Sequence, residues 1–251
     1  EKELMKYYSE HKKATENLNN INEYWNLTMK SFFLKKIQGI IRDKTELKKF
    51  NEIIKHPLLQ SEDRATTFIS KTLYFNIKGL YYHTNKDYKN LLIYCKKLVD
   101  LIESNPQMTK EDNYIASLYN LLLVQIELNK INDALSTINK LRNIDSKSPT
   151  IQTKIFVTSY DTEINLYLRT GEFEKGVSLT GEIEEGLKKF RDKINKESEV
   201  LFAYNIAYLY FGTEDYNKSL KWLNTIINDS ELKIREDIQC FARIMNLLVH
   251  Y

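Results

Sequence analysis

The stretch LFAYNIAYLYFGTEDYNKSLKWLNTIIND, residues 201–229, decides how this chain folds. Its apolar residues recur at three- and four-residue steps on both sides of a polar segment at 212–215, and this is the spacing of an amphipathic helix. The stretch therefore predicts two helices joined by a tight turn, with Thr213 capping the second helix and Asp215 in its first turn. The apolar positions are Leu201, Tyr204, Ala207, Tyr208 and Phe211 before the turn, and Tyr216, Leu220, Leu223 and Ile227 after it.

The same turn recurs three times upstream. An apolar residue opens the helix after each turn, at Tyr88, Ile131, Phe173 and Tyr216, and these positions are 43, 42 and 43 residues apart. A recurrence this regular is the signature of a solenoid, in which each helix pair buries its apolar face on its neighbours. The pattern predicts an all-α α-solenoid of stacked helix-turn-helix repeats with a period of about 42–43 residues.

The residues around these turns resemble the tetratricopeptide repeat (TPR) family. Its first helix carries a small residue and then an aromatic one, and its second helix carries an aromatic and then a small one. The resemblance implies a right-handed superhelical array with a concave groove. The matching sets are Ala207, Tyr210, Tyr216 and Ser219; Gly79, Tyr82 and Tyr88, with Leu91 at the last small site; Tyr167, Gly171, Phe173 and Gly176, with Ile164 at the first small site; and, most weakly, Leu122, Gln125, Ile131 and Ala134.

The period leaves a second repeat class open. It is roughly eight residues longer than the usual TPR period of about 34, whereas HEAT-like repeats span about 40 to 47 residues. The period alone favours the HEAT-like class, and the turn motif favours a TPR-like one. We interpret the extra length as longer helices and longer loops between repeats.

Two parts are predicted along the chain: N-terminal helices in residues 1–60, which can be read as a degenerate first repeat, and a TPR-like array in 61–251. The next turn would fall near position 259, so the last repeat is expected to be incomplete. Ser61, Thr109 with Asp112, and Ser148 before Pro149 are expected helix starts, and Gly171 is an expected stop. The predicted helices are 1–19, 22–42, 45–55, 62–84, 87–104, 109–128, 131–144, 149–170, 172–195 with a break at Gly181 or Gly186, and 232–251.

Composition bounds the class of protein. The chain has 251 residues, 42% of them hydrophobic, with seven glycines, three prolines and a formal net charge of +3. This near-neutral balance gives no reason to expect nucleic-acid binding. No apolar run reaches the length of a membrane span and no signal segment is present, so a cytoplasmic location is expected unless a signal lies upstream.

Cys95 and Cys240 lie in apolar helical runs and are expected to be buried free thiols. The Lys-, Asn-, Ile- and Tyr-rich composition is typical of a low-GC bacterial genome.

A search for catalytic or metal-binding motifs finds none. Four histidines, at positions 11, 56, 83 and 250, are far apart in sequence, and no HExxH, CxxC, phosphate-loop or GxSxG motif is present. The run 181–186 lacks the lysine and threonine of a phosphate loop and is interpreted as an acidic helix face. The sequence therefore predicts no enzyme activity, no cofactor and no metal.

The TPR resemblance implies a groove lined by the first helix of each repeat. Mapping from the turns gives candidate partner-binding residues that combine aromatic rings with amides, groups suited to recognising a peptide. Lysines that would clamp a terminal carboxylate are missing from the equivalent sites, which argues against a chaperone-tail-binding role. The candidates are Asn76, His83, Tyr119, Asn120, Asp161, Asn165, Tyr204, Asn205 and Tyr208.

These observations predict a non-catalytic scaffold that binds a protein or peptide. The alternative is a peptide-sensing regulatory domain, because long-period TPR-like arrays resemble those of bacterial regulators whose effector module would lie outside this segment. The complete reading frame would separate the two hypotheses, since only the second one requires an output module.

Overall fold

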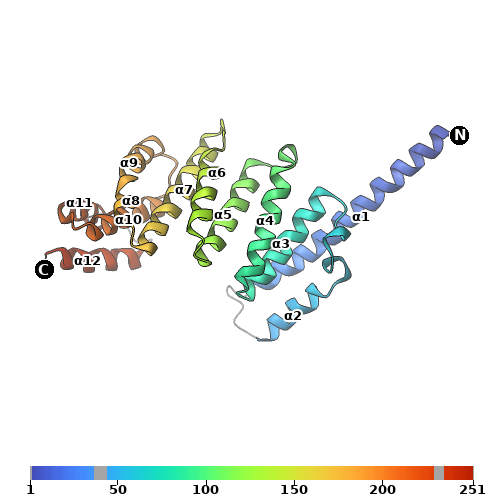
Figure 1. Ribbon diagram of the computed structural model, residues 1–251, viewed down its shortest axis with the longest axis horizontal. Coiled ribbons are helices and arrows are strands. Elements are labelled where there is room, and N and C mark those ends of the chain that lie inside the picture. Colours follow the sequence, from blue (N-terminus) through green and yellow to red (C-terminus); the bar gives the residue numbers. More distant parts are fainter. Residues whose placement is uncertain (1, 37–43, 229–234, 251) are drawn as a thin grey trace. The chain divides into compact units, whose positions relative to one another are not determined.

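The computed structural model describes residues 2–36, 44–228 and 235–250, and every regular element in these ranges is helical (Figure 1). This confirms the all-α class. The chain divides into two compact units, residues 1–129 and 130–251. None of the described helices combines the length and the apolar character needed to cross a bilayer.

The first unit contains five α-helices and three short 3₁₀ turns among its described residues. Their bounds are α1 (Lys2–Lys36), α2 (Lys44–Ile54), η1 (Pro57–Leu59), η2 (Glu62–Arg64), α3 (Phe68–Thr84), α4 (Tyr88–Glu103), η3 (Pro106–Met108) and α5 (Glu111–Glu127). The second unit follows with α6 (Ile131–Arg142), α7 (Pro149–Thr170), α8 (Phe173–Ser178), α9 (Thr180–Lys189), α10 (Lys196–Gly212), α11 (Tyr216–Ile227) and α12 (Glu236–His250).

The helices that follow the four predicted turns begin at the expected residues. α4, α6, α8 and α11 start at Tyr88, Ile131, Phe173 and Tyr216. Two residues before each start, the backbone adopts the left-handed conformation that closes a helix. The residues in this conformation are Lys86 (φ 55°), Asn129 (φ 55°), Gly171 (φ 72°) and Glu214 (φ 62°).

The same hydrogen bond also closes three of these turns. The backbone N–H of Asp87 donates to the carbonyl of Tyr82 over 2.9 Å, and that of Asp215 to the carbonyl of Tyr210 over 2.9 Å. In the Gly171 turn, Glu172 donates to Tyr167 over 3.0 Å. These six-to-one bonds satisfy carbonyls that the last helical turn would otherwise leave open.

Three predicted caps are corrected by the structure. Asp215, rather than Thr213, caps α11 by accepting from the N–H of Lys218. Ser61 caps only η2, and α3 begins later, at a capping box formed by Thr67 and Ser70. Residue 110 precedes α5 without a side-chain cap, so the box expected from Thr109 and Asp112 does not form. In each case backbone geometry, rather than the presence of a hydroxyl nearby, decides which side chain reaches the helix.

Helix lengths differ from the prediction in two parts of the chain. The expected helices 1–19 and 22–42 are one continuous helix as far as Lys36, because no residue near position 20 stops it; the remainder of 22–42 lies outside the described residues. The 172–195 helix breaks at Leu179, not at Gly181 or Gly186, and ends at Lys189. The prediction of Ser148 as a cap, Pro149 as first helical residue and Gly171 as a left-handed stop is confirmed.

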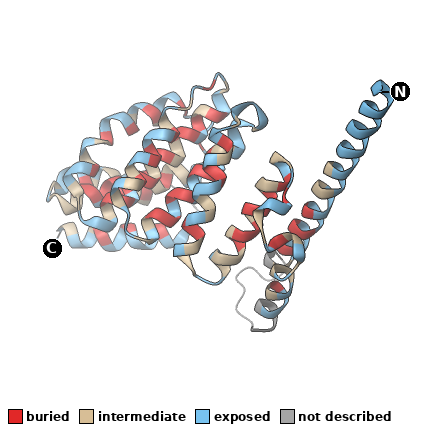
Figure 2. Ribbon diagram, turned by 45° about the vertical axis from the view of Figure 1, so that its right-hand side comes forward, coloured by how far each residue is buried: buried red, intermediate tan, exposed pale blue. Residues whose placement is uncertain are grey.

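The core of the first unit lies where the second half of α1 packs on α3, and α3 on α4. Tyr24 is fully buried, its ring meets the edge of Tyr74, and its hydroxyl donates to the carbonyl of Leu58 over 2.6 Å. The first half of α1 is different: all of its residues up to Glu16 are exposed (Figure 2).

The second unit packs tightly where small residues face large ones. A methyl group on Gly176 of α8 would lie 2.3 Å from Leu209 of α10, and one on Gly212 would lie 2.5 Å from the ring of Phe173. The absent side chains therefore let α8 and α10 approach closely. Two apolar clusters fill the unit, one around Phe156, Phe202 and Ile206, and the other where α10, α11 and α12 meet.

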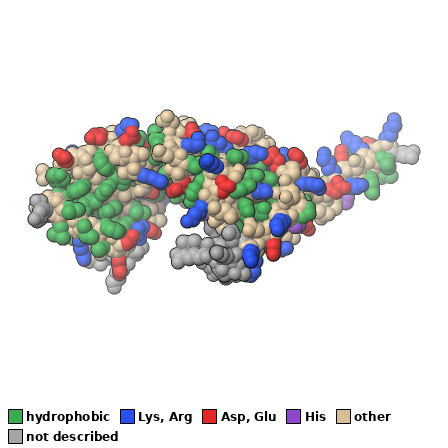
Figure 3. Space-filling model, turned by 60° about the horizontal axis from the view of Figure 1, so that its bottom comes forward, with side chains coloured by type: hydrophobic (Ala, Val, Ile, Leu, Met, Phe, Trp, Pro, Cys, Tyr) green, Lys and Arg blue, Asp and Glu red, His purple; other side chains and the backbone are tan. Residues whose placement is uncertain are grey.

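Several apolar side chains and one cysteine near the C-terminal end of the described chain are exposed to solvent. The exposed face of α12 carries large apolar residues, and hydrophobic side chains gather at the C-terminal end of the chain in Figure 3. Both cysteines are free, but Cys95 is half-buried and Cys240 is exposed, so the prediction of buried thiols is wrong for Cys240. The exposed apolar residues of α12 are Phe241, Ile244, Leu247 and Leu248.

Candidate functional site

Five of the nine predicted site residues come together in the second unit, on the adjoining helices α7 and α10. Asp161 and Asn165 lie on α7, and Tyr204, Asn205 and Tyr208 lie on α10. We call this set the α7–α10 surface. The two helices are held in contact by the aromatic core around Phe156, so the side chains that they carry keep a defined mutual placement.

The other four predicted residues lie in the first unit. Asn76 and His83 are on α3, and Tyr119 and Asn120 are on α5. Helix α4 packs against both α3 and α5. Tyr119 has 39% of its surface exposed, His83 and Asn120 are exposed, and Asn76 is half-buried. These four residues do not belong to the α7–α10 surface.

A polar cluster centred on Asp161 ties the two helices of the surface together. Its Oδ1 accepts from the side-chain amide of Asn165 at 3.1 Å and from that of Asn205 at 3.5 Å. Asn165 also donates to the backbone carbonyl of Asp161 over 2.7 Å. Burial raises the pKa of the Asp161 carboxyl above its usual range, and the Asn165 amide partly opposes this rise.

Burial separates the members of the cluster into two kinds. Asn205 is only 5% exposed, so it is a helix-packing group rather than the groove-surface residue expected from the sequence. Asn165 is exposed, and its amide is accessible from outside. The cluster thus has a buried anchor, Asn205, and an accessible amide, Asn165, around one carboxylate.

Aromatic rings follow one another along α10 beside this cluster. The rings of Tyr204 and Tyr208 are stacked at 6.4 Å with an interplanar angle of 21°, and those of Tyr208 and Phe211 at 6.5 Å with 21°. Phe173 meets Tyr208 edge-on at 6.3 Å. Tyr208 nevertheless stays 38% exposed. Stacking and edge contacts of this kind fix a ring in place, so Tyr208 is a held ring that is still partly exposed.

The hydroxyls of the two tyrosines add polar groups to this aromatic row. Within the described residues, neither the Tyr204 nor the Tyr208 hydroxyl has a hydrogen-bond partner. A phenol can both donate and accept, and an amide offers both a carbonyl and an NH₂ group. The surface therefore combines flat apolar area with groups that can pair with a peptide backbone.

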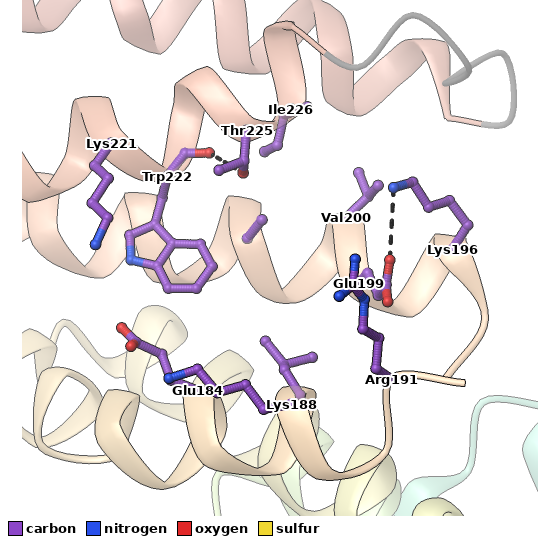
Figure 4. Close-up of a pocket in the computed structure, with 12 residues that line it drawn as sticks. Glu184, Lys188, Arg191, Lys196, Glu199, Val200, Lys221, Trp222, Thr225 and Ile226 are labelled. Atoms are coloured by element: carbon purple, nitrogen blue, oxygen red, sulfur yellow. Dashed lines mark hydrogen bonds and ion pairs between the residues drawn. The ribbon is translucent and has the colours of Figure 1, made fainter. Parts of the chain in front are cut away.

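A second feature of this unit is not predicted by the sequence. A cavity of about 400 Å³ opens between α9, the start of α10, and α11 (Figure 4). The sequence pattern around Glu184 predicts only an acidic helix face. The available signal is the three- and four-residue spacing of Glu184, Leu187 and Lys188, which puts an acidic, an apolar and a basic side chain on one side of α9.

The described residues hold no group of three or more histidine, cysteine, aspartate or glutamate side chains placed to share a metal ion. Comparison with family models, with curated proteins and with solved structures found no match to this chain. A function for the protein is therefore inferred from the geometry of the α7–α10 surface and of the cavity.

Proposed function

We propose that the protein is a non-catalytic scaffold of TPR-like helical repeats that binds a protein or peptide. The recurrence of one turn geometry supports the repeat: left-handed residues at positions 86, 129, 171 and 214 are 43, 42 and 43 residues apart. The close approach of α8 and α10 at Gly176 supports the TPR-like class, because small residues at helix crossings are a mark of that motif.

The binding surface that we propose is the α7–α10 surface. The observation that carries it is Tyr208, whose ring is stacked on both sides along α10 and yet is 38% exposed with an unpaired hydroxyl among the described residues. Ordering such a ring on binding costs little conformational entropy, because its neighbours already hold it. Exposed tyrosines of this kind are frequent hot spots of protein interfaces.

The amide of Asn165 gives the same surface a hydrogen-bonding group with a fixed orientation. It is exposed, and its bonds to Asp161 fix its orientation. A peptide laid along α7 and α10 would place an apolar side chain on Tyr208 and pair its backbone with Asn165 and the tyrosine hydroxyls. The proposed ligand is therefore an extended or helical peptide segment with an apolar anchor.

A random peptide library selected against the full chain tests the proposal. The dissociation constant of each selected peptide is then measured for the wild type and for Tyr208→Ala and Asn165→Ala. We expect Tyr208→Ala to weaken binding by roughly tenfold or more, which is the size of an interface hot spot.

Tyr8→Ala is the matched control, because Tyr8 is a 67% exposed tyrosine on α1 in the other unit. It removes an aromatic ring of the same kind and should leave the dissociation constant unchanged. If selection yields no peptide, or if Tyr8→Ala weakens binding as much as Tyr208→Ala does, the α7–α10 surface is not the binding site.

A further inference from the structure

The cavity beneath Trp222 has an apolar floor. Its floor and lower walls come from α9, α10 and α11, and Val200, Ala203 and Ile226 in it are buried. Trp222 extends from α11 toward α9, and Lys188 lies along α9 beside Glu184 (Figure 4). Two helices therefore form opposite walls of a groove, with a half-buried indole between them.

The rim of this groove carries an excess of positive charge. Four basic side chains line it, Lys188, Arg191, Lys196 and Lys221, against two acidic ones, Glu184 and Glu199. Lys196 lies 3.7 Å from Glu199. With Glu184 counted as well, four positive and two negative charges leave the rim with a net charge of +2. Within the part of the chain that the structure describes, no ion pair involves Lys188, Arg191 or Lys221.

Both the floor and the rim restrict what can bind here. A net positive rim around an apolar floor favours a ligand that combines apolar surface with negative charge, because each part then meets its complement. A groove between two helices of this size accepts the side chains of an amphipathic helix, whose apolar residues lie on one face and whose charged residues flank it. A uniformly apolar ligand would make no favourable contact with the charges of Lys188, Arg191 and Lys221.

We propose that this groove, the α9–α11 groove, binds an acidic amphipathic helix of a partner protein. Apolar side chains of the partner pack against Trp222 and Leu187, and its carboxylates meet Lys188, Arg191 and Lys221 on the two walls. The groove shares no residue with the α7–α10 surface, so the two proposed binding sites can be tested independently.

Trp222 provides a local readout of binding. The chain has two tryptophans, and the other, Trp25, lies 48% exposed on α1 in the first unit. In a Trp25→Phe variant of the full chain, Trp222 is the only indole. The probe is a synthetic helical peptide of about 14 residues with Leu and Phe on one face and Glu at the flanking positions.

The acidic peptide should shift the Trp222 emission to shorter wavelength in a saturable titration. Raising the salt concentration should weaken binding, because exposed charge pairs are screened. The double variant Lys188→Glu with Lys221→Glu should weaken it by roughly tenfold or more. Lys12→Glu with Lys147→Glu changes the net charge equally at two exposed positions outside the groove and should have no effect.

Four results would overturn the proposal. The first is equal binding of a peptide with Lys in place of Glu, and the second is equal binding of sodium laurate, an acyl carboxylate without a helix. The third is loss of peptide binding in Tyr208→Ala but not in the Lys188→Glu, Lys221→Glu variant, which would put the peptide on the α7–α10 surface. The fourth is a wild-type dimer in light scattering that becomes a monomer in the Lys188→Glu, Lys221→Glu variant but not in Tyr208→Ala. This result would make a second copy of the chain the occupant of the groove.

Discussion

The hydroxyl of Ser219 donates to the backbone carbonyl of Ala207, 2.9 Å away, across the interface between α11 and α10. Both residues are fully buried. Serine is small enough to let the two helix backbones meet, and its hydroxyl finds a partner there, so this crossing satisfies both packing and polarity.

The size of residue 219 should matter more than its hydroxyl. Ser219→Ala removes a hydrogen bond worth about 1 kcal/mol, and the better helix propensity of alanine returns about 0.5 kcal/mol. Ser219→Leu forces the helices apart and should cost about 1–3 kcal/mol or more. Urea unfolding followed by circular dichroism measures both, with Asn217→Leu on the exposed side of α11 as the control. Equal stability of the Ser219→Leu variant and the wild type would contradict this packing.

Two glycines in neighbouring helices should respond to alanine in opposite ways. A methyl on Gly176 would lie 2.3 Å from Leu209, whereas one on Gly181 meets nothing within 4 Å. Gly176→Ala should destabilise the protein by about 1–3 kcal/mol through overpacking. Gly181→Ala should stabilise it by up to about 1 kcal/mol, because alanine restricts the unfolded chain and favours the helix. Thermal unfolding of the two variants compares them directly, and shifts of the same sign would show that the α8–α10 contact is not as close as described.

Asp161 should make stability depend on pH in the direction opposite to that of an ion-paired carboxylate. Burial raises its pKa above the ordinary 3.8, so the folded state disfavours the charged form. The resulting loss of folding stability is fully present when the pH is above the pKa of Asp161 in the folded protein. It disappears as the pH falls below the pKa of Asp161 in the unfolded chain. Asp161→Asn keeps an acceptor for Asn165 and Asn205, and it should therefore be more stable than the wild type at pH 7.

The advantage of Asp161→Asn should shrink as the pH is lowered through the raised pKa toward 3.8. Denaturant unfolding of both proteins across this range measures it. Asp192→Asn, at an exposed position after α9, is the control for removal of one negative charge. An Asp161→Asn variant that is less stable at pH 7, or a difference that grows in acid, would contradict burial of the charge.

Arg142 and Glu163 form the most enclosed ion pair for which a geometry is described. Arg142 Nη2 lies 2.6 Å from Glu163 Oε2, the guanidinium lies 3.9 Å from the centre of the Tyr160 ring, and Tyr167 donates to Glu163 Oε1 over 2.9 Å. The side chain of Glu163 is only 8% exposed. Removing the arginine alone would therefore leave a carboxylate buried without its counter-charge.

Arg142→Met should cost about 3 kcal/mol, at the lower end for a broken buried pair because the arginine side chain is 25% exposed. Adding Glu163→Gln should recover much of this loss, since glutamine is uncharged and still accepts from Tyr167. A double-mutant cycle of unfolding free energies measures the coupling. Additive losses would mean that the two side chains do not interact in solution.

Much of the helical layout could be predicted from local sequence signals. The four helix starts at Tyr88, Ile131, Phe173 and Tyr216 follow from the apolar period and the polar turn residues, which act within a few positions of one another. The same locality explains the confirmed start at Pro149. Five of the nine predicted site residues lie on two helices in contact, because mapping from the turns places them on the first helices of two successive predicted repeats.

Tertiary structure decided what depends on distant neighbours. The burial of Asn205, the exposure of Cys240 and the cavity under Trp222 each depend on which helix lies opposite, and sequence periodicity contains no information about that. The sequence by itself determined where most helices begin, because caps, turns and amphipathic spacing are local forces. The packing of α9, α10 and α11 alone decided that Lys188, Arg191 and Lys221 surround one apolar floor, because side chains far apart in the sequence meet only when their helices are stacked.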